Sequence, residues 1–196
     1  MVFMKNIAIF ASGSGSDMQS VIDGTLSGQI DGRVVAVVVN KEGIFAIERA
    51  KKHGIDCKIF KAKDYVDMAQ RDSAIVEYLK GYGVDLIVLA GYLAIITPVL
   101  VDAYEGRIIN IHPSLIPKHC GKGMYGLNVH RSVIASGDKE SGCTVHFVDY
   151  GADTGEIIAQ DKVEVKEDDT PESLQARVLE REHILLPQIV AKLCNR

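Results

Sequence analysis

Residues 7–19 read IAIFASGSGSDMQ, a short apolar run that passes into a turn of glycine and serine and then into a segment that begins near Asp17. Such a run, followed by a tight turn and a helical period, is typical of the first strand–turn–helix unit of a parallel α/β sheet. Backbone N–H groups at the start of a helix bind phosphate groups well. This stretch therefore predicts both an α/β fold and an anion site at the first strand end.

The same alternation continues along the chain. Strands are expected at residues 6–11, 33–39, 56–60, 84–90 and 107–111. Helices are expected at residues 17–27, 44–53, 67–81 and 97–103. Each helix is short enough for a right-handed crossover between parallel strands. The pattern predicts a mostly parallel, Rossmann-like sheet with helices on both faces, and no boundary divides residues 1–196, so a single domain is expected.

The character of the sequence changes after Pro117. Residues 118–128 are rich in glycine and predict a loop over the site, followed by a helix at 129–136. Two strand-like runs, 143–149 and 156–165, are expected to extend the sheet in antiparallel fashion. Thr170-Pro171-Glu172 is a typical helix start, and Pro187 is expected to kink or restart that last helix.

Composition narrows the class of protein. The 196 residues carry a net charge of −4, which argues against nucleic acid as the main partner. The apolar runs are too short to cross a bilayer, and Met1 to Lys5 do not form a charged leader, so a cytoplasmic protein without membrane contact is expected. Four cysteines lie scattered without CxxC spacing, which favours free thiols over a metal site or disulfides.

A second motif, NIHPSLIP at residues 110–117, carries the chemistry. Asn110 and His112 are two apart, so on a strand both side chains face the same way, and Pro113 stiffens the exit. An amide and an imidazole are suitable donors to the oxyanion that forms when a carbonyl carbon passes between amines. His146 and Asp153, in HFVDYGADTG at 146–155, supply a second imidazole and a carboxylate that pairs with an imidazole. A structural histidine and a turn-forming aspartate are the ordinary alternatives.

The turn at Ser12 to Ser16 lacks the third glycine of the dinucleotide fingerprint, because Met18 stands there, and it lacks the lysine of a P-loop. A single phosphate therefore fits the turn better than a nucleotide. The alternative is a plain strand-to-helix turn capped by serine and aspartate.

Taken together, IAIFASGSGSDMQ, NIHPSLIP and HFVDYGADTG resemble, in order along nearly the whole chain, the phosphoribosylglycinamide formyltransferase family of folate-dependent enzymes in purine synthesis. The resemblance implies transfer of the formyl group of 10-formyltetrahydrofolate to the amino group of glycinamide ribonucleotide, without a metal. It implies a formyltransferase fold and small-molecule partners, in a monomer or a homodimer.

The resemblance also implies roles for particular residues. Asn110 and a protonated His112 are expected to stabilise the oxyanion, Asp153 to raise the imidazole pKa and help to move the proton, and His146 to play a secondary part. The substrate phosphate is assigned to Gly13, Ser14, Gly15 and Ser16, with Asp17 as a helix cap, and the amine end of the substrate to Glu182. Folate is assigned to Leu93, Ala94, Ile95, Ile96, Val148, Asp149, Tyr150, Gly151 and Ala152.

Other functions remain open from the sequence. NIHPSLIP is shared by several formyl-transferring and formyl-hydrolysing enzymes, so a formyltetrahydrofolate hydrolase or another folate-dependent formyltransferase, such as the one acting on methionyl-tRNA, is an alternative. Both usually carry an additional domain, and a tRNA-directed enzyme is expected to be more basic. A non-catalytic module that binds a phosphosugar or folate is the alternative from another class.

Overall fold

The computed structural model describes residues 4–195, which form a seven-stranded sheet in the order β3-β2-β1-β4-β5-β6-β7. Neighbouring strands are parallel from β3 to β5, whereas β6 is antiparallel to both of its neighbours, β5 and β7. The strands are β1 (Lys5–Ala11), β2 (Gly32–Val39), β3 (Asp56–Ile59), β4 (Leu86–Leu89), β5 (Ile108–His112), β6 (Glu140–Phe147) and β7 (Ile157–Glu164). The predicted fold class is confirmed, including the antiparallel C-terminal strands.

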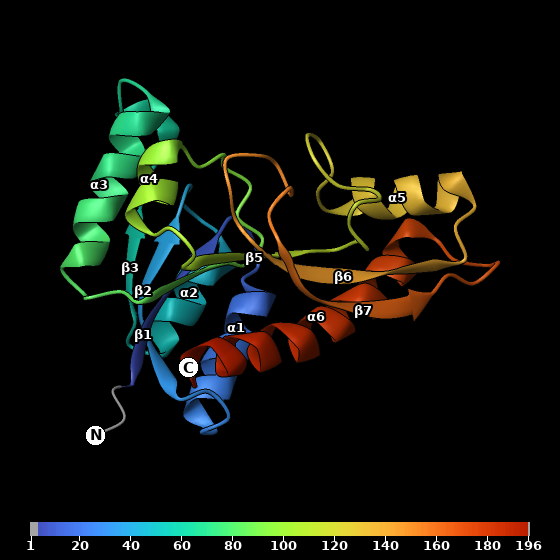
Figure 1. Ribbon diagram of the computed structural model, residues 1–196, viewed down its shortest axis with the longest axis horizontal. Helices are drawn as coiled ribbons and strands as arrows, with labels where there is room; N and C mark the ends of the chain where they lie inside the picture. The colour runs from blue at the N-terminus through green and yellow to red at the C-terminus, as the bar shows by residue number, and fades with distance from the viewer. Residues whose placement is uncertain (1–3, 196) are drawn as a thin grey trace.

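Helices cover both faces of this sheet (Figure 1). They are α1 (Ser16–Leu26), α2 (Phe45–Lys52), α3 (Met68–Lys80), α4 (Pro98–Ala103), α5 (Leu127–Ser136) and α6 (Pro171–Cys194). Alternate residues of β1 point to opposite faces: Ile7 and Ile9 pack with α1, α2 and α6, while Ala8 and Phe10 pack with α3 and α4. Burial on both faces explains why the central strands read as continuous apolar runs.

Some boundaries differ from the prediction. β4 is shorter than the expected 84–90, a 3-10 turn (Ala62–Asp64) lies where none was expected, and β6 begins at Glu140 instead of residue 143. The extra residues of β6 include Gly142, where an added Cβ would lie 2.0 Å from the carbonyl oxygen of Asp161. Close approach of β7 therefore extends the strand through polar residues that local pattern does not favour.

Helix α6 begins as predicted and then runs on. Thr170 accepts a hydrogen bond from the backbone N–H of Ser173 in a capping box, with Pro171 in the first turn. The expected restart at Pro187 is wrong, because the helix is continuous from Pro171 to Cys194. Pro187 is buried, and its Cβ packs close to Gly24 of α1. Packing against α1 thus offsets the missing N–H, a loss of about 3 kcal/mol in a free helix.

The order of the strands creates a switch point between β1 and β4, where the chain turns from one half of the sheet to the other. Ligands of open α/β sheets bind in the crevice at such points. Here the segments that follow the two strands touch: the backbone N–H of Ser12 donates to the Gly91 carbonyl at 3.1 Å, and the Ser12 hydroxyl accepts from the N–H of Leu93 at 2.9 Å. The glycine-rich turn and residues 91–97 therefore lie side by side at this switch point and form adjacent walls of the crevice.

A buried ion pair on α3 fixes the second of these walls. Arg71 and Asp72 are both fully buried, and Arg71 Nε donates to Asp72 Oδ1 at 2.8 Å. Arg71 also donates to the carbonyl of Ile95 at 2.7 Å, and Asp72 accepts from the N–H of Thr97 at 2.6 Å. The pair therefore ties residues 95–97 to α3 through two backbone groups.

Some sequence expectations concern location and cysteine chemistry. The described residues do not include residues 1–3 or residue 196. The prediction that residues 1–5 form no charged leader therefore falls partly outside them, as do the ends of the predicted domain 1–196. Within 4–195, no helix has both the length and the apolar character needed to span a membrane. The four cysteines are free thiols, as expected, and Cys143 and Cys194 are buried.

The Arg71–Asp72 pair yields a stability prediction. Asp72→Ala leaves a buried guanidinium without its counter-charge, so we expect the free energy of unfolding to fall by about 3–5 kcal/mol in urea titrations. Glu77→Gln is the matched control, because it breaks an ion pair with Lys80 on the same helix that is exposed, and it should cost less than about 1 kcal/mol. Equal losses in the two variants would contradict the anchoring role.

Candidate active site

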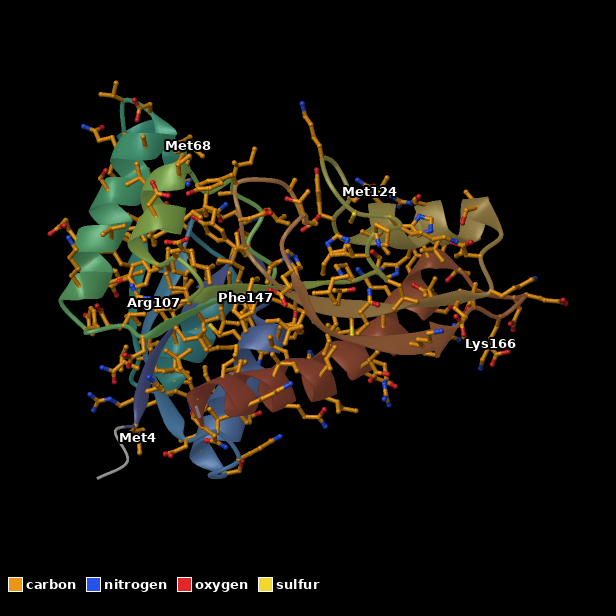
Figure 2. All side chains as sticks on the ribbon, viewed as in Figure 1. Met4, Met68, Arg107, Met124, Phe147 and Lys166 are labelled. Carbon is orange, nitrogen blue, oxygen red and sulfur yellow. The ribbon has the colours of Figure 1, made fainter. Side chains whose placement is uncertain are left out.

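Strand β5 ends in Asn110 and His112, and β6 pairs with it antiparallel so that Asn110 lies opposite His146. His112 is 4% exposed and His146 is 2% exposed. Pairing between the two strands therefore places residues far apart in sequence directly opposite each other. Figure 2 labels Phe147, which follows His146 at the end of β6, near the middle of the molecule. The pairing brings together the amide and both predicted imidazoles.

The hydrogen bonds of His146 orient the Asn110 amide. His146 Nδ1 lies 2.7 Å from the carbonyl oxygen of Phe147, and since a carbonyl only accepts, Nδ1 carries the proton. In the neutral ring, Nε2 is then an acceptor, and it takes a hydrogen bond from Asn110 Nδ2 at 3.1 Å. The amide nitrogen, and not its oxygen, therefore faces the cluster. The family resemblance implies only a secondary part for His146.

Asp153 completes the cluster from the loop between β6 and β7. Its carboxylate accepts from the backbone N–H of Gly121 at 2.9 Å and from Asn110 Nδ2 at 3.4 Å. Its oxygens lie 3.6 Å from His112 Nδ1 and 3.6 Å from His146 Nε2. All four residues predicted to be catalytic are thus brought together, and Gly121 adds a donor.

Local sequence shapes the loop that carries Asp153. Asp149 Oδ1 accepts from the N–H of Gly151 at 3.0 Å and from the Thr154 hydroxyl at 2.6 Å, which closes an Asx-type turn. At Gly155 an added Cβ would meet the Phe147 carbonyl oxygen at 1.8 Å, so only glycine fits. Asp153 itself has a φ of 59°, a conformation that few residues other than glycine adopt.

Burial and charge act in opposite directions on the imidazole and the carboxylate. Burial lowers the pKa of His112, and the nearby Asp153 carboxylate and the His119 carbonyl offset this only in part, so the net direction is downward. For Asp153, burial raises the pKa, but the two neighbouring imidazoles and the backbone N–H of Gly121 outweigh it, so the pKa falls. The resting site therefore holds a neutral His112 beside an ionised Asp153. Asp153 raises the pKa of His112, in the expected direction, but burial outweighs this contribution.

The glycine-rich turn lies at the end of β1 and leads into α1. Gly15 has a φ of 70°, and an added Cβ there would lie 2.9 Å from the Ala46 Cβ, so the position requires glycine. Arg49 of α2 supports the turn, because its Nε donates to the carbonyl of Ser14 at 2.9 Å. Ser16, Arg49 and His183 line a surface cavity of about 500 Å³ beside the turn. The N-terminus of α1 favours an anion at this point.

Asp17 does not cap α1, contrary to expectation. The N-cap is Gly15, and no side-chain cap hydrogen bond is present. The carboxyl of Asp17 turns toward α6 instead, with Oδ1 3.5 Å from His183 Nε2. Burial raises its pKa to about 6, and burial together with Asp17 raises the pKa of Glu182. Glu182 is only 6% exposed, and its carboxyl lies next to that of Asp17.

The residues assigned to folate fall into two segments that share one core cluster. Leu93 and Ile95 are 54% and 77% exposed, while Ala94 and Ile96 pack against the core on the α3 side, as does Val148. Tyr150 is exposed and its hydroxyl donates to Asp102 at 2.6 Å. Asp149 and Gly151 are engaged in the turn described above, and Ala152 is exposed. Leu93 and Ile95 therefore present apolar surface near the switch point.

Several contacting residues were missed by pattern. His119, Gly121, Arg49 and the Arg71–Asp72 pair act through long-range contacts or backbone groups, for which the sequence gives no local signal. Within the described residues, no group of three or more histidine, cysteine, aspartate or glutamate side chains is arranged to hold a metal ion.

The strand-end amide, the paired imidazoles and the carboxylate define a site for acyl-type group transfer, since together they offer an oxyanion donor and a route for a proton. The chain belongs to the formyl transferase family, whose model matches residues 5–190. This confirms the family resemblance of the sequence motifs.

Relatives support the same assignment. The chain is 44% identical over 192 residues to the chloroplastic phosphoribosylglycinamide formyltransferase of Arabidopsis thaliana, covering 97% of this chain and 66% of that protein. It is 40% identical over 187 residues to the phosphoribosylglycinamide formyltransferase of Haemophilus influenzae, covering 95% and 86%. A crystal structure of glycinamide ribonucleotide transformylase 1 from Symbiobacterium toebii superposes with a TM-score of 0.93 at 38% identity, covering 98% and 88%.

A buried histidine next to the site predicts acid sensitivity. His130 of α5 is 1% exposed, and burial, with a contribution from His112, lowers its pKa from 6.5 to about 4. Below pH 6.5 the unfolded chain binds a proton that the folded chain excludes, so the free energy of unfolding falls as pH falls toward 4.

We expect His130 to account for about 3 kcal/mol of this loss, and His130→Leu should remove it. Urea unfolding of the two proteins at several pH values between 7 and 4 measures the difference in slope. Asp17 and Glu182 act with the opposite sign in both proteins, so they cancel in the comparison. Parallel curves would show that His130 is not the responsible group.

Proposed function

We propose that this chain transfers the formyl group of 10-formyltetrahydrofolate to the amino group of glycinamide ribonucleotide, a step of purine biosynthesis that gives formylglycinamide ribonucleotide and tetrahydrofolate. The observation that carries the proposal is the cluster of Asn110, His112, His146 and Asp153 in a member of the formyl transferase family. The names of the relatives agree with this activity.

The chemistry begins with attack of the neutral substrate amine on the formyl carbon. A C–N bond forms, and the formyl oxygen becomes an oxyanion that accepts a hydrogen bond from Asn110 Nδ2. The 3.4 Å contact of that nitrogen with Asp153 is long, so one N–H is available to turn toward the oxyanion. A preorganised donor of this kind contributes about 3 kcal/mol to transition-state stabilisation.

His112 manages the proton. Its Nε2 donates to the His119 carbonyl at 3.0 Å, so in the neutral ring Nδ1 is free to accept. Nδ1 takes the proton from the attacking nitrogen and delivers it to the leaving nitrogen of the folate as that C–N bond breaks. The imidazolium exists only between these steps, and the Asp153 carboxylate 3.6 Å away stabilises it. No net proton is gained or lost by the enzyme.

Two regions bind the substrates in this proposal. The phosphate of glycinamide ribonucleotide lies on Gly13, Ser14, Gly15 and Ser16, with the N-terminus of α1 as its electrostatic partner. Glu182 is assigned to the amine end of that substrate, and its buried carboxyl lies next to Asp17. The pterin of the donor lies against the apolar surface of Leu93 and Ile95 and the loop at 148–152.

The test of the activity uses purified protein, 10-formyltetrahydrofolate and glycinamide ribonucleotide, with deformylated folate followed by absorbance. We expect turnover that depends on the acceptor. Formate release without acceptor would replace the transferase by a hydrolase, and binding of both ligands without turnover would reduce the chain to a binding module.

Asp153→Asn tests the proton route. We expect kcat to fall about a hundredfold or more while both KM values change little, because proton management is lost and binding is kept. The acid limb of the kcat/KM profile should move to lower pH, since Asp153 raises the pKa of His112 and its charge is gone. Steady-state kinetics from pH 5 to 9 measure both effects.

Glu156→Gln is the matched control, because it removes an exposed negative charge from the same loop. It should leave kcat and the pH profile near those of the unmodified chain. Full activity of Asp153→Asn would remove Asp153 from the mechanism.

A further inference from the structure

The two ring nitrogens of His112 meet two residues with an unusual backbone. Among residues 4–195, His119 (φ 53°) and Asp153 (φ 59°) are the non-glycine residues with positive φ. One supplies the carbonyl that accepts from His112 Nε2 at 3.0 Å, and the other the carboxylate 3.6 Å from Nδ1. Such conformations cost about 1 kcal/mol or more each and persist only where surrounding contacts hold them.

The contacts that hold His119 come from its own side chain. His119 Nδ1 lies 2.8 Å from the Ser132 hydroxyl on α5, and Nε2 lies 2.9 Å from Asp138 Oδ2. Asp138 follows Gly137, which ends α5 in the left-handed conformation, and its Oδ1 accepts a hydrogen bond from Lys118 Nζ at 2.9 Å. With its side chain 12% exposed, His119 bridges α5 and the turn before β6.

The bridge has a consequence for the proton on His112. A carbonyl oxygen held at Nε2 stabilises the tautomer with the proton on Nε2, which leaves Nδ1 as the nitrogen that faces Asp153. Release of the carbonyl would let the ring rotate or place the proton on Nδ1, where it would block uptake from the substrate amine. Distant groups that orient a catalytic histidine in this way commonly contribute a factor of about 10–100.

We propose that His119, held by Ser132 and Asp138, is a positioning residue that fixes the tautomer and orientation of His112. Its effect on catalysis rests on the proposed function, whereas its effect on the His112 ring does not. Other groups that bear on His112 are Asp153, His146 and His130, and none of them touches Nε2 in the hydrogen bonds of the described residues.

The kinetic test leaves residue 119 intact and loosens its supports. We expect Asp138→Ala and Ser132→Ala each to lower kcat about tenfold, with KM for both substrates within about twofold. Asp138→Asn keeps an acceptor oxygen for His119 Nε2 and should restore most of the loss. Lys139→Ala changes an exposed neighbour of Asp138 and should leave kcat unchanged.

Nitrogen NMR of the histidine rings tests the same inference without turnover, with His112 assigned by its loss in His112→Gln. The unmodified protein should show His112 protonated on Nε2, and Asp138→Ala should show a mixture of tautomers or a shifted pH titration. If Asp138→Ala fails to fold, Ser132→Ala supplies the same comparison.

The two outcomes separate cleanly. If both Asp138→Ala and Ser132→Ala leave the His112 signal and kcat unchanged, His119 only stabilises its own loop, and the inference is overturned. A changed His112 signal in a protein that does not turn over glycinamide ribonucleotide would support the positioning role and reject the proposed function.

Discussion

A half-buried carboxylate needs donors, and the site is organised around that requirement. The oxygens of Asp153 accept from the Asn110 amide on β5 and from the backbone N–H of Gly121, and they lie 3.6 Å from an imidazole nitrogen on each of β5 and β6. Leaving such a charge unpaired costs several kcal/mol, so segments far apart in the sequence are drawn to one point. The antiparallel pairing of β6 with β5 serves this arrangement, because its register sets His146 opposite Asn110.

The balance between burial and charge also decides what the imidazole can do. If Asp153 dominated, His112 would stay protonated and would have no room for the substrate's proton. Burial wins for His112, and hydrogen bonding wins for Asp153, so the two groups stand in different charge states at rest. A separation of this kind is what a site needs in order to accept a proton and then release it.

The sequence predicted those features of the site that depend on neighbouring residues. Local chemistry accounts for the strand that ends at Asn110 and His112 and for the sharp turn at Gly15, and the structure contains both. Asp17 was misassigned because capping is a local rule, whereas its carboxyl is drawn toward α6 by tertiary packing. The expected restart at Pro187 fails for the same reason, since the contact of Pro187 with α1 leaves no signal in the sequence.

The antiparallel register and the support of His119 depend on residues separated by a helix or a loop. His146 faces Asn110 only because the ladder between β5 and β6 has one particular register, which a shift of one residue would reverse. The bridge from His119 to Ser132 and Asp138 likewise needs α5 in place first. Neither contact leaves a periodic signal in the sequence.

The cysteines carry a practical consequence. Burial raises the pKa of Cys57 and of Cys194 to about 11, and it raises the pKa of Cys120 and Cys143 as well. At neutral pH only about one in ten thousand Cys57 or Cys194 thiols is then ionised and reactive. A new cysteine at the exposed Lys122, on the glycine-rich segment that reaches Asp153 through Gly121, would therefore be alkylated in preference to Cys57 and Cys194. With the partly buried Cys120 replaced, a fluorescent label there would report on this segment.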